Sequence, residues 1–191
     1  MQNEANNPYF SVVVTSRNDD HGGDMLGRMN VFARTLLEQL ARYRVPSELI
    51  FVEWNPPSDR PRLRDVLNWP EDRYPCDVRF VEVPPEVHAT FRHAEALPLF
   101  QMIAKNVGIR RARGDFVLAT NIDILFSDAL VRHIAARRLR RGRMYRMDRH
   151  DIRETVPADG DLDERLAFCA DPKNLLRVCE RGGTRDARTG E

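Results

Sequence analysis

Two side chains that carry oxygen atoms follow a short apolar segment near the middle of the chain. The run Phe116-Val-Leu-Ala-Thr120 is typical of a buried strand and leads directly into Asn121-Ile122-Asp123. Because alternate residues of an extended segment point the same way, we expect Asn121 and Asp123 to face one ligand. An aspartate there suits a hard divalent cation, Mg²⁺ or Mn²⁺, that also holds phosphate oxygens. Alternatively, the two residues only shape the turn into the next helix.

Strand and helix patterns alternate around this motif. The order predicts an α/β fold in which a mostly parallel sheet carries helices on both faces, within one domain over 9–180. Ligands bind such sheets at the carboxyl ends of the strands, here the loops after Thr15, Val52 and Thr120. A polar tail over 181–191 is expected to be disordered. The expected strands are 10–15, 48–54, 78–83, 116–120 and 143–148. Two helices are expected to begin after a cap on Asp24 and after Asp59. Three more are expected from Leu99 to Arg113, from a cap on Ser127 to about Arg141, and from Asp161 to Ala170.

The stretch from Ala104 to Asp123 resembles the centre of family 2 glycosyltransferases with the GT-A fold. In that family a helix with an Asn-x-Gly-x-x-x-Ala-x-Gly pattern leads into a strand that ends in Asp-x-Asp. The first strand with the Asn18 after it, and the acidic Glu53 at the end of the second strand, match the family in the same order. The resemblance covers roughly residues 9 to 150, and its helix motif consists of Asn106, Gly108, Ala112 and Gly114.

This resemblance implies a GT-A type of fold and transfer of a sugar from a nucleotide-sugar, with UDP as the expected nucleotide, to a hydroxyl acceptor. Asp123 would ligate the Mn²⁺ or Mg²⁺ that bridges the two phosphates, and Asn121 would touch the ribose. Glu53 would accept hydrogen bonds from uracil or a ribose hydroxyl. Lys105 would add positive charge near the donor, unless it is only a solvated helix residue. The other residues assigned to the donor are Ser16, Arg17, Asn18 and Asn106.

Two departures from the family pattern leave other functions open. Asn121 replaces the first aspartate of the motif, which removes one charge and weakens the expected metal site. No convincing acceptor-activating base follows Asp148, so we expect the general base outside this chain and the fold to be incomplete at its C-terminus. The alternative is a non-catalytic nucleotide-binding module of the same fold. A nucleotidyltransferase is less favoured, because the loop Asp19-Asp20-His21-Gly22-Gly23 is acidic rather than basic.

Composition restricts the class of protein further. The chain has 191 residues with a formal net charge of +1, and no apolar run reaches the length of a spanning helix. Three cysteines without a CxxC pair fit a reducing compartment. We therefore expect a cytoplasmic protein with no integral membrane segment and no nucleic-acid partner. The arginine run 137–143 is interpreted as the solvated end of a helix, with phosphate or polynucleotide binding as the less favoured alternative.

Several polar and aromatic residues near the expected site have a structural and a functional interpretation. The loop from Pro84 to Pro98 is expected either to close over a bound donor or to be an ordinary exposed loop, and a zinc site on its two histidines is improbable. For Trp54, packing in the interior is favoured over stacking on a base. The histidines are His88 and His93, and second-rank candidates for metal or donor contacts are Asp148, His150 and Asp151.

Overall fold

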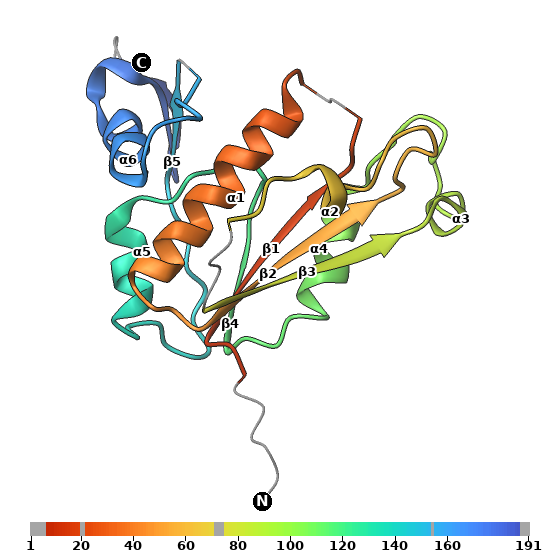
Figure 1. Cartoon of the computed structure of the whole chain (residues 1–191), viewed down its shortest axis with the longest axis horizontal. Helices are drawn as coiled ribbons and strands as arrows, with labels where there is room; N and C mark the ends of the chain where they lie inside the picture. Colours follow the sequence, from red (N-terminus) through yellow and green to blue (C-terminus); the bar gives the residue numbers. More distant parts are fainter. Residues whose placement is uncertain (1–6, 20–21, 71–74, 154, 188–191) are drawn as a thin grey trace, which may run out of the picture. The chain divides into compact units, whose positions relative to one another are not determined.

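The first four expected strands pair into one parallel sheet in the computed structural model, which describes residues 7–19, 22–70, 75–153 and 155–187. Their order is β3-β2-β1-β4, and every neighbouring pair is parallel, as the sequence predicts. Every residue of β1 and β2 is buried, whereas β3 and β4 at the edges are partly exposed. The strands are β1 (Phe10–Ser16), β2 (Ser47–Trp54), β3 (Cys76–Val83) and β4 (Phe116–Ala119) (Figure 1).

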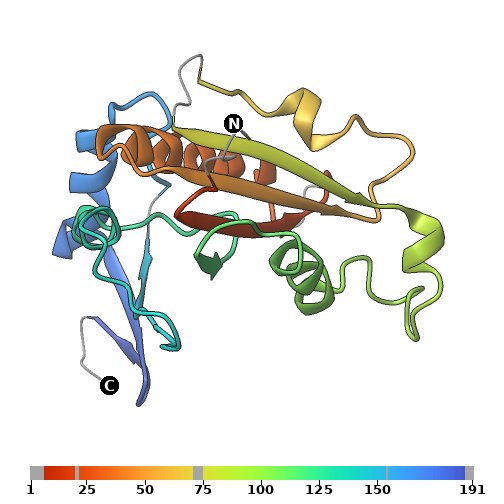
Figure 2. The same cartoon turned by 90° about the horizontal axis from the view of Figure 1, so that it is seen from below.

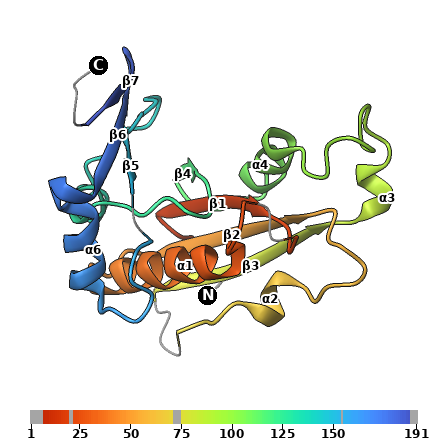
Figure 3. The same cartoon turned by 90° about the horizontal axis from the view of Figure 1, so that it is seen from above.

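Helices cover both faces of this sheet. The two connections that lead from β1 to β2 and on to β3 place α1 (Met25–Arg42) and α2 (Leu63–Val66) on one face. The connection that returns from β3 to β4 places α4 (Gln101–Ile109) on the opposite face (Figures 2 and 3). A short helix, α3 (Pro85–His88), precedes α4 in the same connection. The direction of strand addition therefore reverses between β1 and β4.

A glycine allows α4 to lie close against the sheet. A Cβ atom on Gly108 would stand 2.4 Å from Cγ1 of Val13 and 3.0 Å from Cγ2 of Val52. Any larger residue would push the helix away from β1 and β2, so the glycine of the helix motif has a packing reason. Around this contact lies a buried cluster made of Val13, Ile50, Val52, Trp54, Val83 and Ala104.

The residue before α1 does not cap the helix as the sequence predicts. Asp24 occupies the N-cap position, but its side chain makes no capping hydrogen bond. Its backbone is left-handed (φ 42°), whereas a capping side chain needs an extended backbone to reach the first free amides. The helix is held instead by its apolar face, which buries Met29, Phe32, Ala33, Leu36, Leu37 and Leu40.

The chain divides after Phe126 into two compact units, Met1–Phe126 and Ser127–Glu191, which differs from the single domain expected over 9–180. Within its described residues the second unit adds no strand to the parallel sheet, and it has an antiparallel sheet of its own in the order β5-β6-β7. Its elements are α5 (Asp128–Ala135), β5 (Arg149–Ile152), α6 (Leu162–Ala170), the 3₁₀ helix η1 (Pro172–Asn174), β6 (Leu175–Glu180) and β7 (Gly183–Asp186).

Three expectations for the second unit were wrong in detail. Residues 143–148 form no strand, and the strand that follows at 149–152 is antiparallel. Ser127 caps α5 as expected, but the helix ends at Ala135 rather than near Arg141, because Arg137 adopts a left-handed φ of 56°. The expected polar tail contains β7, whose backbone pairs with β6 without needing apolar side chains; residues 188–191 lie outside the described part. Within the described residues, no helix is both long enough and apolar enough to cross a membrane.

Candidate functional site

The reversal of strand order between β1 and β4 marks the place where an open α/β sheet binds ligands. The helix after β1 and the helix before β4 lie on opposite faces of the sheet (Figure 3). Open α/β sheets bind ligands at the carboxyl ends of the strands where the strand order reverses in this way. Ser16 ends β1 on this carboxyl edge and Arg17 follows it, and Asn121 and Asp123 follow β4. These are residues that the sequence predicts for a donor site.

Asn121 is held by two donors from α4. Its Oδ1 atom accepts hydrogen bonds from Nζ of Lys105 at 2.7 Å and from Nε2 of Gln101 at 2.9 Å. Burial lowers the pKa of the Lys105 amine, and the charge of Asp123 partly opposes this effect. The fold thus brings Lys105, which was expected only to add charge near the donor, against Asn121, and it places a cation at the carboxyl edge.

Asp123 contacts a cation from the opposite face of the sheet. Its Oδ2 lies 3.3 Å from Nη1 of Arg28 on α1, and the two side chains are 37% and 34% exposed. The motif does not continue the strand as expected: β4 ends at Ala119, and Ile122 and Asp123 lie in a turn. Ile122 points into the core with 6% exposure, and its polar neighbours lie at the edge.

Arg28 and Gln101 were missed by the sequence reasoning. A signal for Arg28 exists, since the start of a helix favours anionic rather than cationic side chains, and α1 has no acidic residue in its first turn. A basic residue placed so early on the helix after β1 suggests an anionic partner nearby. Gln101 carries no comparable signal, because a glutamine at the start of a helix is common.

Arg17 and Asn18 at the end of β1 have different surroundings. Arg17 donates from Nη1 to the carbonyl of Pro98 at 3.3 Å, and its Nε lies 3.4 Å from a carboxylate oxygen of Asp19. Asn18 is 4% exposed, and its Nδ2 donates to the carbonyl of Pro61 at 2.9 Å. Arg17 therefore borders the edge, whereas the amide group of Asn18 holds the segment before α2. The neighbouring Asp20 and His21 lie outside the described residues.

Glu53 is buried rather than open to a nucleotide. The residue is only 1% exposed, and its Oε1 accepts a hydrogen bond from the backbone amide of Leu63 at 3.0 Å. Burial raises the pKa of this carboxyl, although the amide of Leu63 and the charge of Arg62 act against that rise. Glu53 and Asn18 thus hold the same segment, the residues 57–63 beside the carboxyl edge. Asn106, a further predicted contact, is exposed on α4.

The connection from Pro84 to Pro98 packs against the end of β2 through aromatic rings. The indole of Trp54 is fully buried and donates to Nδ1 of His88 at 2.8 Å, while Nε2 of His88 lies 3.0 Å from the carbonyl of Ala94. Both ring nitrogens are therefore engaged, so His88 is a packing residue and not a metal ligand. Phe91 and Phe100 complete the group, with ring centroids 5.6 Å and 6.1 Å from the indole. The packing interpretation of Trp54 is confirmed.

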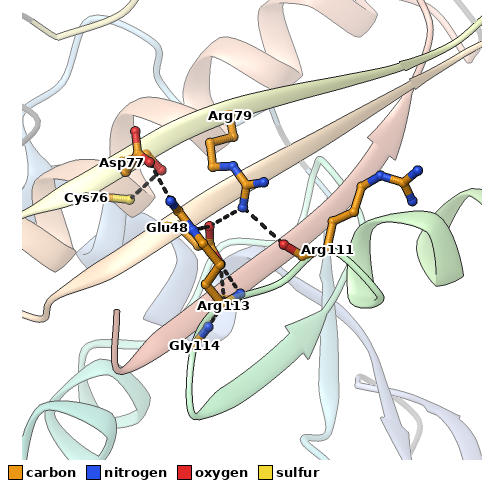
Figure 4. A network of polar contacts seen from close by, with 8 residues as sticks. Glu48, Cys76, Asp77, Arg79, Arg111, Arg113 and Gly114 are labelled. Carbon is orange, nitrogen blue, oxygen red and sulfur yellow. Dashed lines mark hydrogen bonds and ion pairs between the residues drawn. The ribbon is translucent and has the colours of Figure 1, made fainter. Parts of the chain in front are cut away.

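A buried carboxylate at the other end of the sheet fixes the turn that leads into β4 (Figure 4). Glu48 on β2 is fully buried and accepts hydrogen bonds from Oγ of Ser11 at 2.7 Å, the amide of Arg113 at 2.6 Å and Nη1 of Arg79 at 2.6 Å. Burial alone would raise the pKa of Glu48, but these hydrogen bonds outweigh it, so the pKa is lowered. The amide of Gly114 donates to the same Ser11 hydroxyl at 2.9 Å.

The last glycine of the helix motif belongs to this network. A Cβ atom on Gly114 would lie 2.6 Å from Oγ of Ser11 and 2.8 Å from its backbone nitrogen. The motif residues Gly108 and Gly114 therefore set the position of α4 and β4, and through them the positions of Lys105 and Asn121. A cavity of about 250 Å³, bordered by Asp77 and Arg113, also lies at this end, away from the charged carboxyl edge. We place the candidate site by topology and charge rather than by that cavity.

The donor set at the carboxyl edge fits a divalent cation only in part. Across the described residues, no three histidine, cysteine, aspartate or glutamate side chains converge on a common metal position. Asp123 offers one accessible carboxylate, while the Asn121 oxygen is occupied by two donors. A Mg²⁺ site built on substrate phosphates commonly uses one or two carboxylates. Asp123 would supply one of them, and its Oδ2 also pairs with Arg28.

Comparisons with protein-family models, with curated proteins and with solved structures find no significant match to this chain. The assignment of the site therefore rests on the strand order, the charges and the contacts described above.

Proposed function

We propose that the carboxyl edge between β1 and β4 binds the diphosphate of a nucleotide-sugar, and that the chain is the donor-binding part of a family 2-like glycosyltransferase of the GT-A type. The observation that supports this most is the pair of cations that face the edge from opposite sides of the sheet. Lys105 contacts Asn121 from α4, and Arg28 contacts Asp123 from α1. Two phosphates carry the charge that such an arrangement would balance.

Each cation would take a separate part in binding. The Lys105 amine, which already donates to Asn121, has further protons for a phosphate oxygen. The Arg28 guanidinium spans a longer contact of 3.3 Å to Asp123, so a phosphate can replace or share that contact. Both groups would stabilise the negative charge that develops on the departing nucleoside diphosphate. A Mn²⁺ or Mg²⁺ ion on Asp123 would supply the same kind of stabilisation as a Lewis acid.

The nucleoside would lie along the end of β1. Arg17 reaches across this edge to Pro98, and the segment 57–63 is held beside it by Asn18 and Glu53. In this proposal Arg17 touches the base or ribose, while Asn18 and Glu53 act by positioning the segment. Glu53 would touch uracil directly only after that segment moves, because its carboxylate is buried.

A nucleotide-binding module without transfer activity is the second candidate. It is favoured by Asn121, whose oxygen is already satisfied by Lys105 and Gln101 where the family carries an aspartate. Transfer to a hydroxyl acceptor also needs a general base, and we assign none at this edge. Binding is common to both candidates, and turnover of a UDP-sugar with a hydroxyl acceptor separates them.

The location of the site is tested by following backbone amide signals of the labelled protein by NMR while UDP is added. We expect the largest shifts at 16–18, around Arg28, at 101–105 and at 121–123. Shifts confined to other segments, or none at high UDP concentration, would contradict the proposed location. The same titration with inorganic diphosphate should move the signals near Lys105 and Arg28 but leave those around Arg17 nearly unchanged.

A further inference from the structure

The connection between α5 and β5 in the second unit is an exposed, strongly basic segment. We call residues 137–149 the Arg-Met segment; all of them except Leu139 are exposed, and only its last residue lies in a strand. It holds one aspartate, Asp148, while the whole chain carries a net charge of only +1. Positive charge is therefore concentrated here. The arginines of the segment are Arg137, Arg138, Arg140, Arg141, Arg143, Arg146 and Arg149.

Large apolar side chains alternate with these arginines and project into solvent. Met144 is 96% exposed, Met147 53% and Tyr145 48%. The Tyr145 hydroxyl accepts the backbone amide of Arg140 at 2.8 Å, which folds the segment back on itself and fixes the ring. Exposed apolar side chains are ordinary when scattered singly, but three within four residues of a basic segment suggest a partner with an apolar layer.

The end of a helix does not account for this charge. Cations complement a helix dipole only within its last turn, and α5 ends at Ala135. Arg143 and Arg146 lie well beyond that turn, so their charge has no helix end to complement. Among the described residues, neither of these guanidinium groups forms an ion pair. The interpretation of the run as a solvated helix end, made from the sequence, therefore explains at most its first residues.

We propose that the Arg-Met segment docks the protein on an anionic membrane surface. The guanidinium groups would bind lipid phosphates, while the thioether side chains of Met144 and Met147 enter the interface and Tyr145 lies at the level of the headgroups. A polynucleotide would use the same phosphate contacts but would stack bases on aromatic rings, and the segment offers one ring and two methionines. The apolar side chains therefore favour a lipid surface. This docking does not depend on nucleotide binding.

Sedimentation of the full chain with lipid vesicles tests the proposal. We expect binding to vesicles of phosphatidylcholine and phosphatidylglycerol in equal parts, and little binding to phosphatidylcholine alone. Each arginine near an anionic surface strengthens binding about five-fold, so the double variant Arg143→Gln/Arg146→Gln should bind roughly 25-fold more weakly. The control Arg177→Gln/Arg181→Gln removes the same charge from exposed positions of the same unit and should retain most of the binding.

A second variant distinguishes lipid insertion from plain charge attraction. Met144→Ser/Met147→Ser leaves the charge unchanged and should weaken vesicle binding about ten-fold or more, because two apolar side chains no longer enter the interface. The proposal is overturned if this variant binds like the parent chain, or if neither vesicle is bound. It is also overturned if the segment binds single-stranded oligothymidine more tightly than the anionic vesicles. Light scattering could also show that the parent chain is a dimer and the methionine variant a monomer. That result would overturn the membrane proposal and assign the surface to contact with a second copy of the chain.

Discussion

Replacing Lys105 by methionine should weaken UDP binding without unfolding the protein. The variant keeps the stem of the side chain and removes the ammonium group that lies 2.7 Å from the Asn121 oxygen. A hydrogen bond between charged groups contributes about 1.5–3 kcal/mol, and Lys105 is only partly screened by water, so we take about 2 kcal/mol. That value corresponds to a roughly 30-fold increase in Kd. Isothermal titration calorimetry measures it directly.

The fold should tolerate this change because Asn121 keeps a second donor. The Gln101 amide still donates to Asn121 at 2.9 Å, so we expect the free energy of unfolding to fall by about 1 kcal/mol or less. The chain offers a matched control, since its only other lysine is Lys173 in the second unit. Lys173→Met should bind UDP like the parent chain. Equal UDP affinity in the two lysine variants would refute the role given to Lys105.

The same interaction predicts how UDP affinity depends on pH. Burial lowers the pKa of Lys105 in the folded protein below its usual value of about 10.5. Between the two pKa values the unfolded chain binds more protons, so the free energy of unfolding contributed by this group rises with pH there. UDP affinity should fall with pH over that window, because only the charged amine attracts phosphate. Lys105→Arg, which stays charged, should bind UDP with an affinity that changes little over the same window.

Two further variants test the framework that positions the site. Gly108→Ala forces a methyl group to within 2.4 Å of Val13 and should cost about 1–3 kcal/mol of stability, whereas Gly182→Ala, with open space around it, should leave Tm nearly unchanged. Glu48→Gln should destabilise the protein by about 3 kcal/mol at neutral pH in urea unfolding, because it breaks a buried ion pair. Since the Glu48 pKa is lowered from about 4.5, its contribution is lost as pH falls below that value, and the glutamine variant should lose less stability there. If the parent chain and Glu48→Gln lost stability equally as the pH falls, the role given to the Glu48 charge would be wrong. Equal Tm values for Gly108→Ala and Gly182→Ala would contradict the packing role given to Gly108.

The sequence predicts the parallel sheet well because its central strands are apolar on both faces. β1 and β2 are rich in β-branched and large apolar residues and are bounded by polar loops, and the structure places them at the centre of the sheet with every residue buried. Lys105 and Asn121 were assigned to one donor site from the sequence, and the helix and strand that carry them follow one another with a short turn between, but their hydrogen bond was not predicted. The short connection between α4 and β4 fixes which of their residues lie at the same edge of the sheet.

Contacts between distant segments were not predictable in the same way. Arg28 and Asp123 are 95 residues apart in sequence and meet only because the fold brings the start of α1 to the turn that follows β4. Glu48 gave one signal, a charge within a buried strand, but its partners come from three other segments. In the second unit the helix pattern continues past Ala135, yet the left-handed backbone at Arg137 ends it, and nothing local marks that residue.

The most direct test of the central proposal is calorimetric titration of UDP into the protein with and without Mn²⁺, beside Asp123→Ala. We predict UDP binding that Mn²⁺ strengthens in the parent chain. In the variant, which lacks the one accessible carboxylate of the motif, Mn²⁺ should no longer strengthen it. Residual metal-free binding through Lys105 and Arg28 should persist in both proteins. An absence of UDP binding in a folded sample, under either condition, would contradict the assignment of this edge as a nucleotide-sugar site.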